Sequence, residues 1–132
     1  MDHKLQLIII SSIINFMFFT SGIDKVLHFS KVVEGLKKRF PFELPFIFYN
    51  LMISIAILIE LIAPIIIVFG IIHPTYKKYG VYACYSLIVF TVLATLMYHF
   101  PPKGNQWYPF TSNITTVGGL LALSVLLFHK MK

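Results

Sequence analysis

The stretch "ILIELIAPIIIVFG", residues 57–70, decides the class of this chain. It places one glutamate, Glu60, and one proline, Pro64, inside an apolar run that extends from residue 46 to residue 72. An α-helix needs about 20 apolar residues to cross a bilayer, and this run is longer. The stretch therefore predicts a membrane span that carries an ionisable group near its middle.

Composition extends this prediction to the whole chain. Hydrophobic residues make up 58% and charged residues 12%, and the mean hydropathy is +0.82, far from the balance of a soluble domain. The four predicted spans are residues 5–25, 46–72, 79–100 and 110–128. None alternates with the period of two that a β-barrel requires, so the backbone hydrogen bonds must be satisfied within helices. We expect an all-α integral membrane protein in which residues 1–132 form one four-transmembrane-helix bundle.

Four spans place both termini on one side of the membrane, called side A, and the loops at residues 23–45 and 101–109 on the opposite side, side B. Because no small-x-small cleavage site follows the first run, we expect an uncleaved span rather than a signal peptide. Lysine and arginine are divided almost evenly between the two sides, so the distribution of positive charge does not decide the orientation.

The segment "VLHFSKVVEGLKKRF", residues 26–40, predicts an amphipathic helix between spans 1 and 2. Its apolar residues recur at helical spacing, at Val26, Phe29, Val33, Leu36 and Phe40. Two roles remain open: the helix lies in the interface on side B, or its apolar face packs on the bundle. The net charge of +6 is spread over both membrane faces, so we expect anionic lipid headgroups as partners and no nucleic acid.

Polar residues within the spans fall on helical stripes. The stripes are Ser11, Asn15, Phe18, Gly22 and Lys25 in the first span, Cys84, Thr91, Thr95 and His99 in the third, and Asn113, Thr116 and Ser124 in the fourth. Buried polar groups in hydrocarbon need partners, so we expect the stripes to face one another and to bring Lys25, His99 and Asn113 together near side B. The small residues Gly118 and Gly119 are expected to admit a close neighbouring helix.

Glu60 has two open interpretations. As a structural group it would be neutral and bonded to Asn15 or a threonine; as a functional group it would accept a proton or bind a ligand. Asn15 is the expected partner at its level, because Lys25 reaches Glu60 only if its long side chain points inward. Pro64 lacks the N–H that would bond the Glu60 carbonyl, which predicts a kink.

Several kinds of chemistry are excluded or disfavoured. Cys84 is the only cysteine, so the chain has no internal disulfide and no Cys-x-x-Cys pair for dithiol chemistry. The sequence shows no acidic metal cluster, and we expect no metal site. A haem held by His28 and His99 is a disfavoured alternative, because histidines at a membrane surface are common.

Four segments, "FMFFTSGIDKVLHF", "LIELIAPIIIVFG", "FTVLATLMYHF" and "PFTSNITTVGGLLAL", follow one another along the chain. In this order they resemble the DoxX family of small four-span membrane proteins. The more specific points of likeness are Gly22, Lys25, Glu60, Asn113, Gly118 and Gly119.

The resemblance implies two different functions. One is a non-autonomous membrane subunit of a sulfur or quinone oxidoreductase or of a stress-related complex, with a pocket for an apolar or quinone-like ligand. That pocket would be lined by Lys25, Glu60, His99 and Asn113. The other is a non-enzymatic scaffold, assembly chaperone or cargo receptor for another membrane protein. Because no intrinsic redox centre is visible, we do not expect a stand-alone enzyme.

A third possibility, a small proton or solute pathway, would need polar residues from Glu60 to side A, and only Ser11 and Ser12 supply them. The resemblance alone places both termini in the cytosol.

Overall fold

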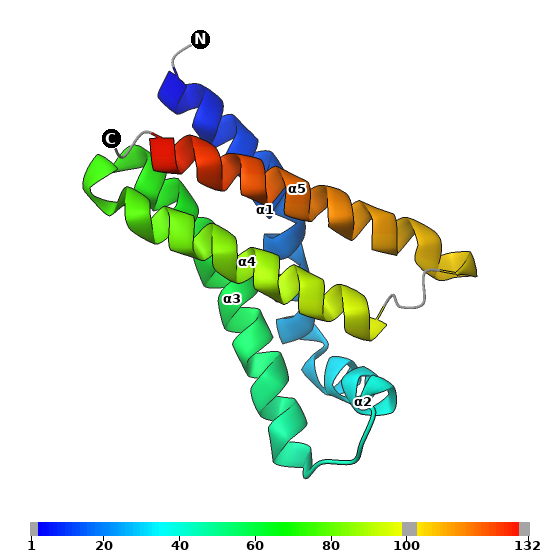
Figure 1. Cartoon of the computed structure of the whole chain (residues 1–132). Coiled ribbons are helices and arrows are strands. Elements are labelled where there is room, and N and C mark those ends of the chain that lie inside the picture. The colour runs from blue at the N-terminus through cyan, green and yellow to red at the C-terminus, as the bar shows by residue number, and fades with distance from the viewer. Residues whose placement is uncertain (1–2, 99–102, 130–132) are drawn as a thin grey trace.

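The computed structural model describes residues 3–98 and 103–129, and over these residues the chain forms an all-helical bundle (Figure 1). Four of the described helices are long and apolar enough to cross a membrane. They are α1 (His3–Leu27), α3 (Phe46–Ile72), α4 (Lys77–Tyr98) and α5 (Trp107–His129). The shorter elements are α2 (Phe29–Arg39) and the 3-10 turns η1 (Pro74–Tyr76) and η2 (Gly104–Gln106). The predicted all-α membrane bundle of four spans is confirmed.

The side A end of the bundle is closed by close contact between α3 and α4. A Cβ atom on Gly70 would lie 3.0 Å from the carbonyl oxygen of Tyr76 and 3.4 Å from Cα of Gly80, so the two backbones approach where neither residue has a side chain. The main core cluster lies in this half and includes Leu7, Ile67, Ile71, Val81, Leu123 and Leu127, all at most 4% exposed. The core of this half is therefore mostly aliphatic.

Toward side B, α3 and α4 diverge, and α2 lies between their ends (Figure 1). Val33 and Leu36 of α2 are buried against Tyr49 and Ile53 of α3 in a second core cluster. Partly buried Met97 and Tyr98, at the end of α4, pack against the same cluster. The apolar face of α2 thus packs on the bundle, as one of the two predicted roles requires.

Two contacts hold α2 in place. The guanidinium carbon of Arg39 lies 4.9 Å from the centre of the Tyr98 ring, which links α2 to α4. The Tyr49 hydroxyl accepts a hydrogen bond from the Leu44 N–H at 3.0 Å and donates one to the Phe42 carbonyl at 3.2 Å. The loop between α2 and α3 is therefore pinned to the first turn of α3.

Candidate functional site

The stripe predicted on α1 is buried in the bundle, with Ser11, Asn15, Phe18 and Gly22 all facing inward. At Gly22 a Cβ atom would lie 2.7 Å from Cδ2 of Leu61 and 3.2 Å from Cβ of Glu60. The missing side chain therefore lets α1 approach α3 at the level of Glu60. This contact sets which residues of α1 can reach that carboxylate.

Lys25 lies three residues after Gly22, which is nearly one helical turn. Its Nζ lies 2.6 Å from Oε1 of Glu60 and donates a hydrogen bond to the Ser21 hydroxyl at 2.7 Å. The Glu60 side chain is 2% exposed and that of Lys25 is 20% exposed. The contact is an ion pair rather than a well-directed hydrogen bond, because Oε1 makes no hydrogen bond among the described residues.

The ion pair explains how the span tolerates a carboxylate. A lone charge at this depth costs several kcal/mol, whereas a close opposite charge offsets part of that cost and leaves the pair with no net charge. Ser21, four residues before Lys25, was not predicted as part of the site. Its spacing of four residues on one helix face was the available signal.

The expected pairing of Glu60 with Asn15 is wrong. Asn15 is 4% exposed, but neither its Oδ1 nor its Nδ2 makes a hydrogen bond within the described part of the chain. The residue of α1 opposite Glu60 is Gly22. Asn15 lies seven residues earlier, so it is about 10 Å nearer side A and out of register with the carboxylate.

The polar stripes of α4 and α5 meet near side B. Asn113 donates from Nδ2 to the Thr95 hydroxyl at 3.0 Å. The Thr95 hydroxyl donates to the Thr91 carbonyl at 2.6 Å, and the Thr91 hydroxyl donates to the Leu87 carbonyl at 2.7 Å. His99, also predicted for this site, lies outside the described residues.

A cavity of about 580 Å³ brings these groups together on the side B half of the bundle. Lys25, Glu60, Thr91 and Asn113 line it, and Asp24, Arg39 and Tyr98 lie at the part nearest α2. Most of the remaining lining is apolar and includes the flexible side chains of Met17, Met52 and Met97. Lys25 and Asn113 therefore line the same cavity, although each has its own hydrogen-bond partner.

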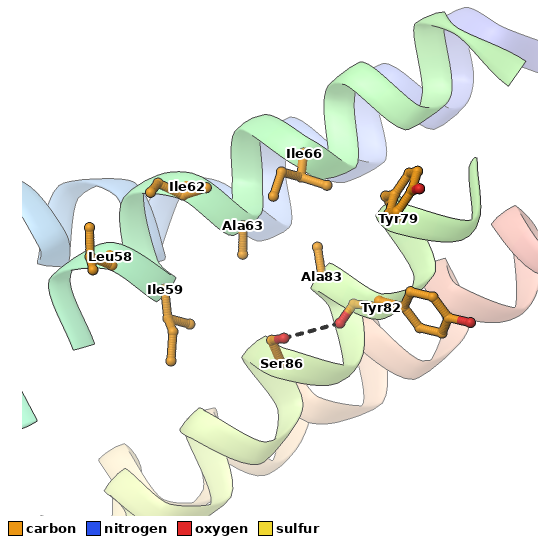
Figure 2. Close-up of a pocket in the computed structure, with 9 residues that line it drawn as sticks. All are labelled: Leu58, Ile59, Ile62, Ala63, Ile66, Tyr79, Tyr82, Ala83 and Ser86. Atoms are coloured by element: carbon orange, nitrogen blue, oxygen red, sulfur yellow. Dashed lines mark hydrogen bonds between the residues drawn. The ribbon is translucent and has the colours of Figure 1, made fainter. Parts of the chain in front are cut away.

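A hollow of different character lies between α3 and α4. It measures about 350 Å³. Figure 2 shows isoleucines and Leu58 on one wall and Tyr79, Tyr82 and Ser86 on the other. None of the described residues that line it is charged. The Ser86 hydroxyl donates to the Tyr82 carbonyl at 3.1 Å, so it is already engaged. Polar chemistry is thus available in the larger cavity and not here.

Structural roles were predicted for Gly118, Gly119 and Pro64, and their surroundings differ. A Cβ atom on Gly119 would lie 3.5 Å from Cδ1 of Ile14, where α5 passes α1. The close approach expected at Gly118 is not made among residues 3–98 and 103–129, because that glycine is on the outer face of α5 with no neighbouring atom of these residues within 4 Å of such a Cβ. Pro64 is buried on the same face of α3 as Glu60, and the helix is continuous through it.

No described group of three or more histidine, cysteine, aspartate and glutamate side chains could hold a metal ion. His28, proposed as one axial ligand of a haem, is exposed, and its Nδ1 lies 3.1 Å from Oδ1 of Asp24. Its proposed partner His99 falls outside the described residues.

The family model described as DoxX matches residues 8–100. This range includes Gly22, Lys25 and Glu60, whereas Asn113 lies beyond it. The chain matches no curated protein and no solved structure.

Proposed function

The chain belongs to the DoxX family, and on that premise we propose that this multi-pass membrane protein is a non-autonomous subunit of an oxidoreductase or stress-related complex. Its role in that complex is to hold a quinone-like or other apolar ligand in the cavity beside Lys25 and Glu60. The redox centre comes from another membrane subunit, because the single cysteine of this chain provides no dithiol pair.

The observation that carries the proposal is the Lys25–Glu60 ion pair on the wall of a cavity of about 580 Å³. An ion pair with a purely structural role needs no free volume beside it. Cavities that bind small molecules are mostly apolar, measure about 300–1,000 Å³ and carry a few convergent polar groups. The cavity meets each of these criteria.

The polar groups suit a ligand that has carbonyl or hydroxyl oxygens. A lysine ammonium has three N–H donors; that of Lys25 donates one to Ser21 and pairs by charge with Glu60, which leaves a donor for a ligand. That donor can bind a carbonyl oxygen of the ligand, and the Glu60 carboxylate can accept or return a proton there. The methionine side chains adapt to the shape of a ring.

A scaffold, assembly chaperone or cargo receptor is the second candidate, and one observation favours it. Gly118 and Ala122 lie four residues apart on a face of α5 that the described residues leave exposed. Small residues at this spacing are typical of contacts between membrane helices. A proton or solute pathway is not favoured, because the apolar residues Leu7, Ile71 and Leu127 fill the side A half of the bundle.

The orientation rests on the family resemblance. It places both termini in the cytosol, so that α2 and its exposed lysines Lys31, Lys37 and Lys38 lie at the lipid headgroups of the opposite side. Labelling of cysteines introduced at residues 2 and 132, in a Cys84→Ser background, tests this arrangement. Reaction with a membrane-impermeant reagent in intact cells would contradict it.

The function is tested by purification in native lipid followed by mass spectrometry of all that is retained. A bound quinone supports the first candidate, whereas a stoichiometric membrane protein without a small ligand supports the scaffold. A tail-less quinone is then titrated into nanodiscs. Lys25→Met and Glu60→Gln should each weaken its binding on the order of tenfold, the equivalent of one charge-assisted hydrogen bond. Lys31→Met and Glu34→Gln, on the exposed face of α2, are matched controls. Equal binding by all four variants would refute the proposal.

A further inference from the structure

We infer that the ligand of this cavity is a long-tailed membrane amphiphile that enters sideways between α3 and α4 and leaves its apolar tail in a groove on the outer face of these helices. The inference rests on the proposed function, because it assigns the entry route and chemical class of the same ligand. The observation behind it is that the polar cavity and two apolar hollows adjoin and share lining residues.

The polar cavity and an outer groove share part of their walls. The outer groove measures about 530 Å³ and lies between α3 and α4. Met52 and Ala56 of α3, with Phe90 and Leu93 of α4, line both this groove and the polar cavity. The partition between the two spaces is therefore only one layer of side chains thick.

This partition lies where the two helices separate. Close packing at Gly70 and Gly80 holds α3 and α4 together at side A, and they diverge toward side B (Figure 1). Ala56 offers the smallest side chain of the partition, and Met52 is flexible. Leu93 is 60% exposed, so its rotamer is not held by packing. We assign the gap at these side chains as a lateral doorway.

The side B end of the cavity lies beneath α2. There α2 covers the end of the cavity, with Val33 and Leu36 buried against α3 and Arg39 stacked on Tyr98 of α4. A ligand dissolved in the bilayer does not need to enter past α2, because the doorway faces hydrocarbon. The arrangement therefore favours a ligand that partitions into the membrane.

The outer groove continues away from the doorway. Ile59, Tyr82 and Ser86 line both the outer groove and the apolar hollow of Figure 2. From Met52 to Ile66 the combined groove follows fifteen residues of α3, which is about 21 Å from the first Cα to the last. Only a ligand with an extended apolar chain would use this length.

The continuity with the polar cavity identifies the occupant. A transmembrane helix is about 10 Å wide and cannot enter the doorway, whereas a single isoprenoid or acyl chain can pass it. The head of such a ligand reaches Lys25, Glu60 and Asn113, which supply charge and hydrogen bonds. The tail stays in the groove, where the Ser86 hydroxyl is already bonded and no charged side chain is present.

The test compares two quinones with the same head, one without a tail and one with a long isoprenoid tail, in nanodiscs of fixed lipid content. Ile59→Trp fills the groove without lining the polar cavity, and Ala56→Phe fills the doorway. Ile13→Trp on the outer face of α1 is the control for added bulk. Both groove variants should weaken the long-tailed ligand on the order of tenfold, while Ile59→Trp changes tail-less binding by less than about twofold.

The two proposals fail in different ways. If the unaltered protein does not bind the tail-less quinone, the proposed function is refuted. If it binds that quinone but Ile59→Trp leaves the long-tailed ligand unaffected, or weakens both ligands equally, the doorway and groove are refuted while the cavity remains. Should Ala56→Phe not yield folded protein, Ile59→Trp alone decides the outcome.

Discussion

The side A and side B halves of this bundle are built from the same four long helices, yet they pack in opposite ways. At side A, Gly70 and Gly80 bring α3 and α4 into backbone contact around a core of aliphatic side chains. At side B the same helices diverge around a cavity of about 580 Å³ that contains Lys25 and Glu60. The difference shows that one set of helices can pack closely at one end and enclose an open volume at the other.

Gly22 lies at the boundary between the two halves. Its lack of a side chain seats α1 against Leu61 and Glu60, and Lys25 follows one turn later. Close helix packing at a glycine, which also holds the side A half together, therefore positions the Lys25 ammonium beside Glu60 in the side B half. The predictions below test each half separately.

The largest effect is expected from Lys25→Met. It leaves the Glu60 carboxylate buried without a partner, which should lower the free energy of unfolding by about 3 kcal/mol. Reversible unfolding in mixed micelles measures this change. Lys31→Met, on the exposed face of α2, should stay within about 0.5 kcal/mol of the unaltered protein. Equal losses of stability at the two lysines would contradict a stabilising role of the ion pair.

The closed half is tested by Gly70→Ala, for which we expect a loss of about 2 kcal/mol. The new Cβ would lie 3.0 Å from the Tyr76 carbonyl oxygen, and backbone atoms on both sides leave little room to relax. Gly118→Ala is the matched control, because no neighbouring atom of the described part of the chain would lie within 4 Å of its Cβ. It should leave stability unchanged or raise it by up to about 1 kcal/mol through better helix propensity. Similar losses at both glycines would contradict the contrast between them.

A smaller effect is expected from Asn113→Leu. It removes the hydrogen bond to Thr95, and bonds between membrane helices contribute about 0.6 kcal/mol on average. Combined with Lys25→Met, its effect on unfolding should be additive, because the two residues have different partners. Quinone affinity should instead be non-additive if one ligand contacts both residues, as the proposed function requires. Additive losses of affinity would argue against a shared site.

Sequence alone predicted the parts of this molecule that depend on hydropathy and periodicity. The apolar run at residues 46–72 coincides with α3, and the buried stripe of α1 contains Ser11, Asn15, Phe18 and Gly22 as its spacing indicated. Bilayer thickness and helical repeat fix these features without knowledge of which helices touch.

The pairings between helices were predicted less well, because they depend on register. Counting residues put Glu60 level with Asn15, but the contact at Gly22 shifts α1 by about 10 Å along α3. Nor does the composition of α5 indicate that α1 passes beside Gly119 rather than Gly118. The cavity depends on the divergence of α3 and α4, which no local pattern encodes.

The central claim is that Lys25 and Glu60 act as one pair within the membrane, and a double-mutant cycle on the free energy of unfolding tests it most directly. Lys25→Met leaves a buried carboxylate unpaired, and Glu60→Leu leaves a lysine that can still turn toward side B, so the second loss should be the smaller. With both charges replaced by apolar side chains, the double variant should be more stable than Lys25→Met by at least about 1 kcal/mol. A double variant whose loss equals the sum of the two single losses would contradict the account.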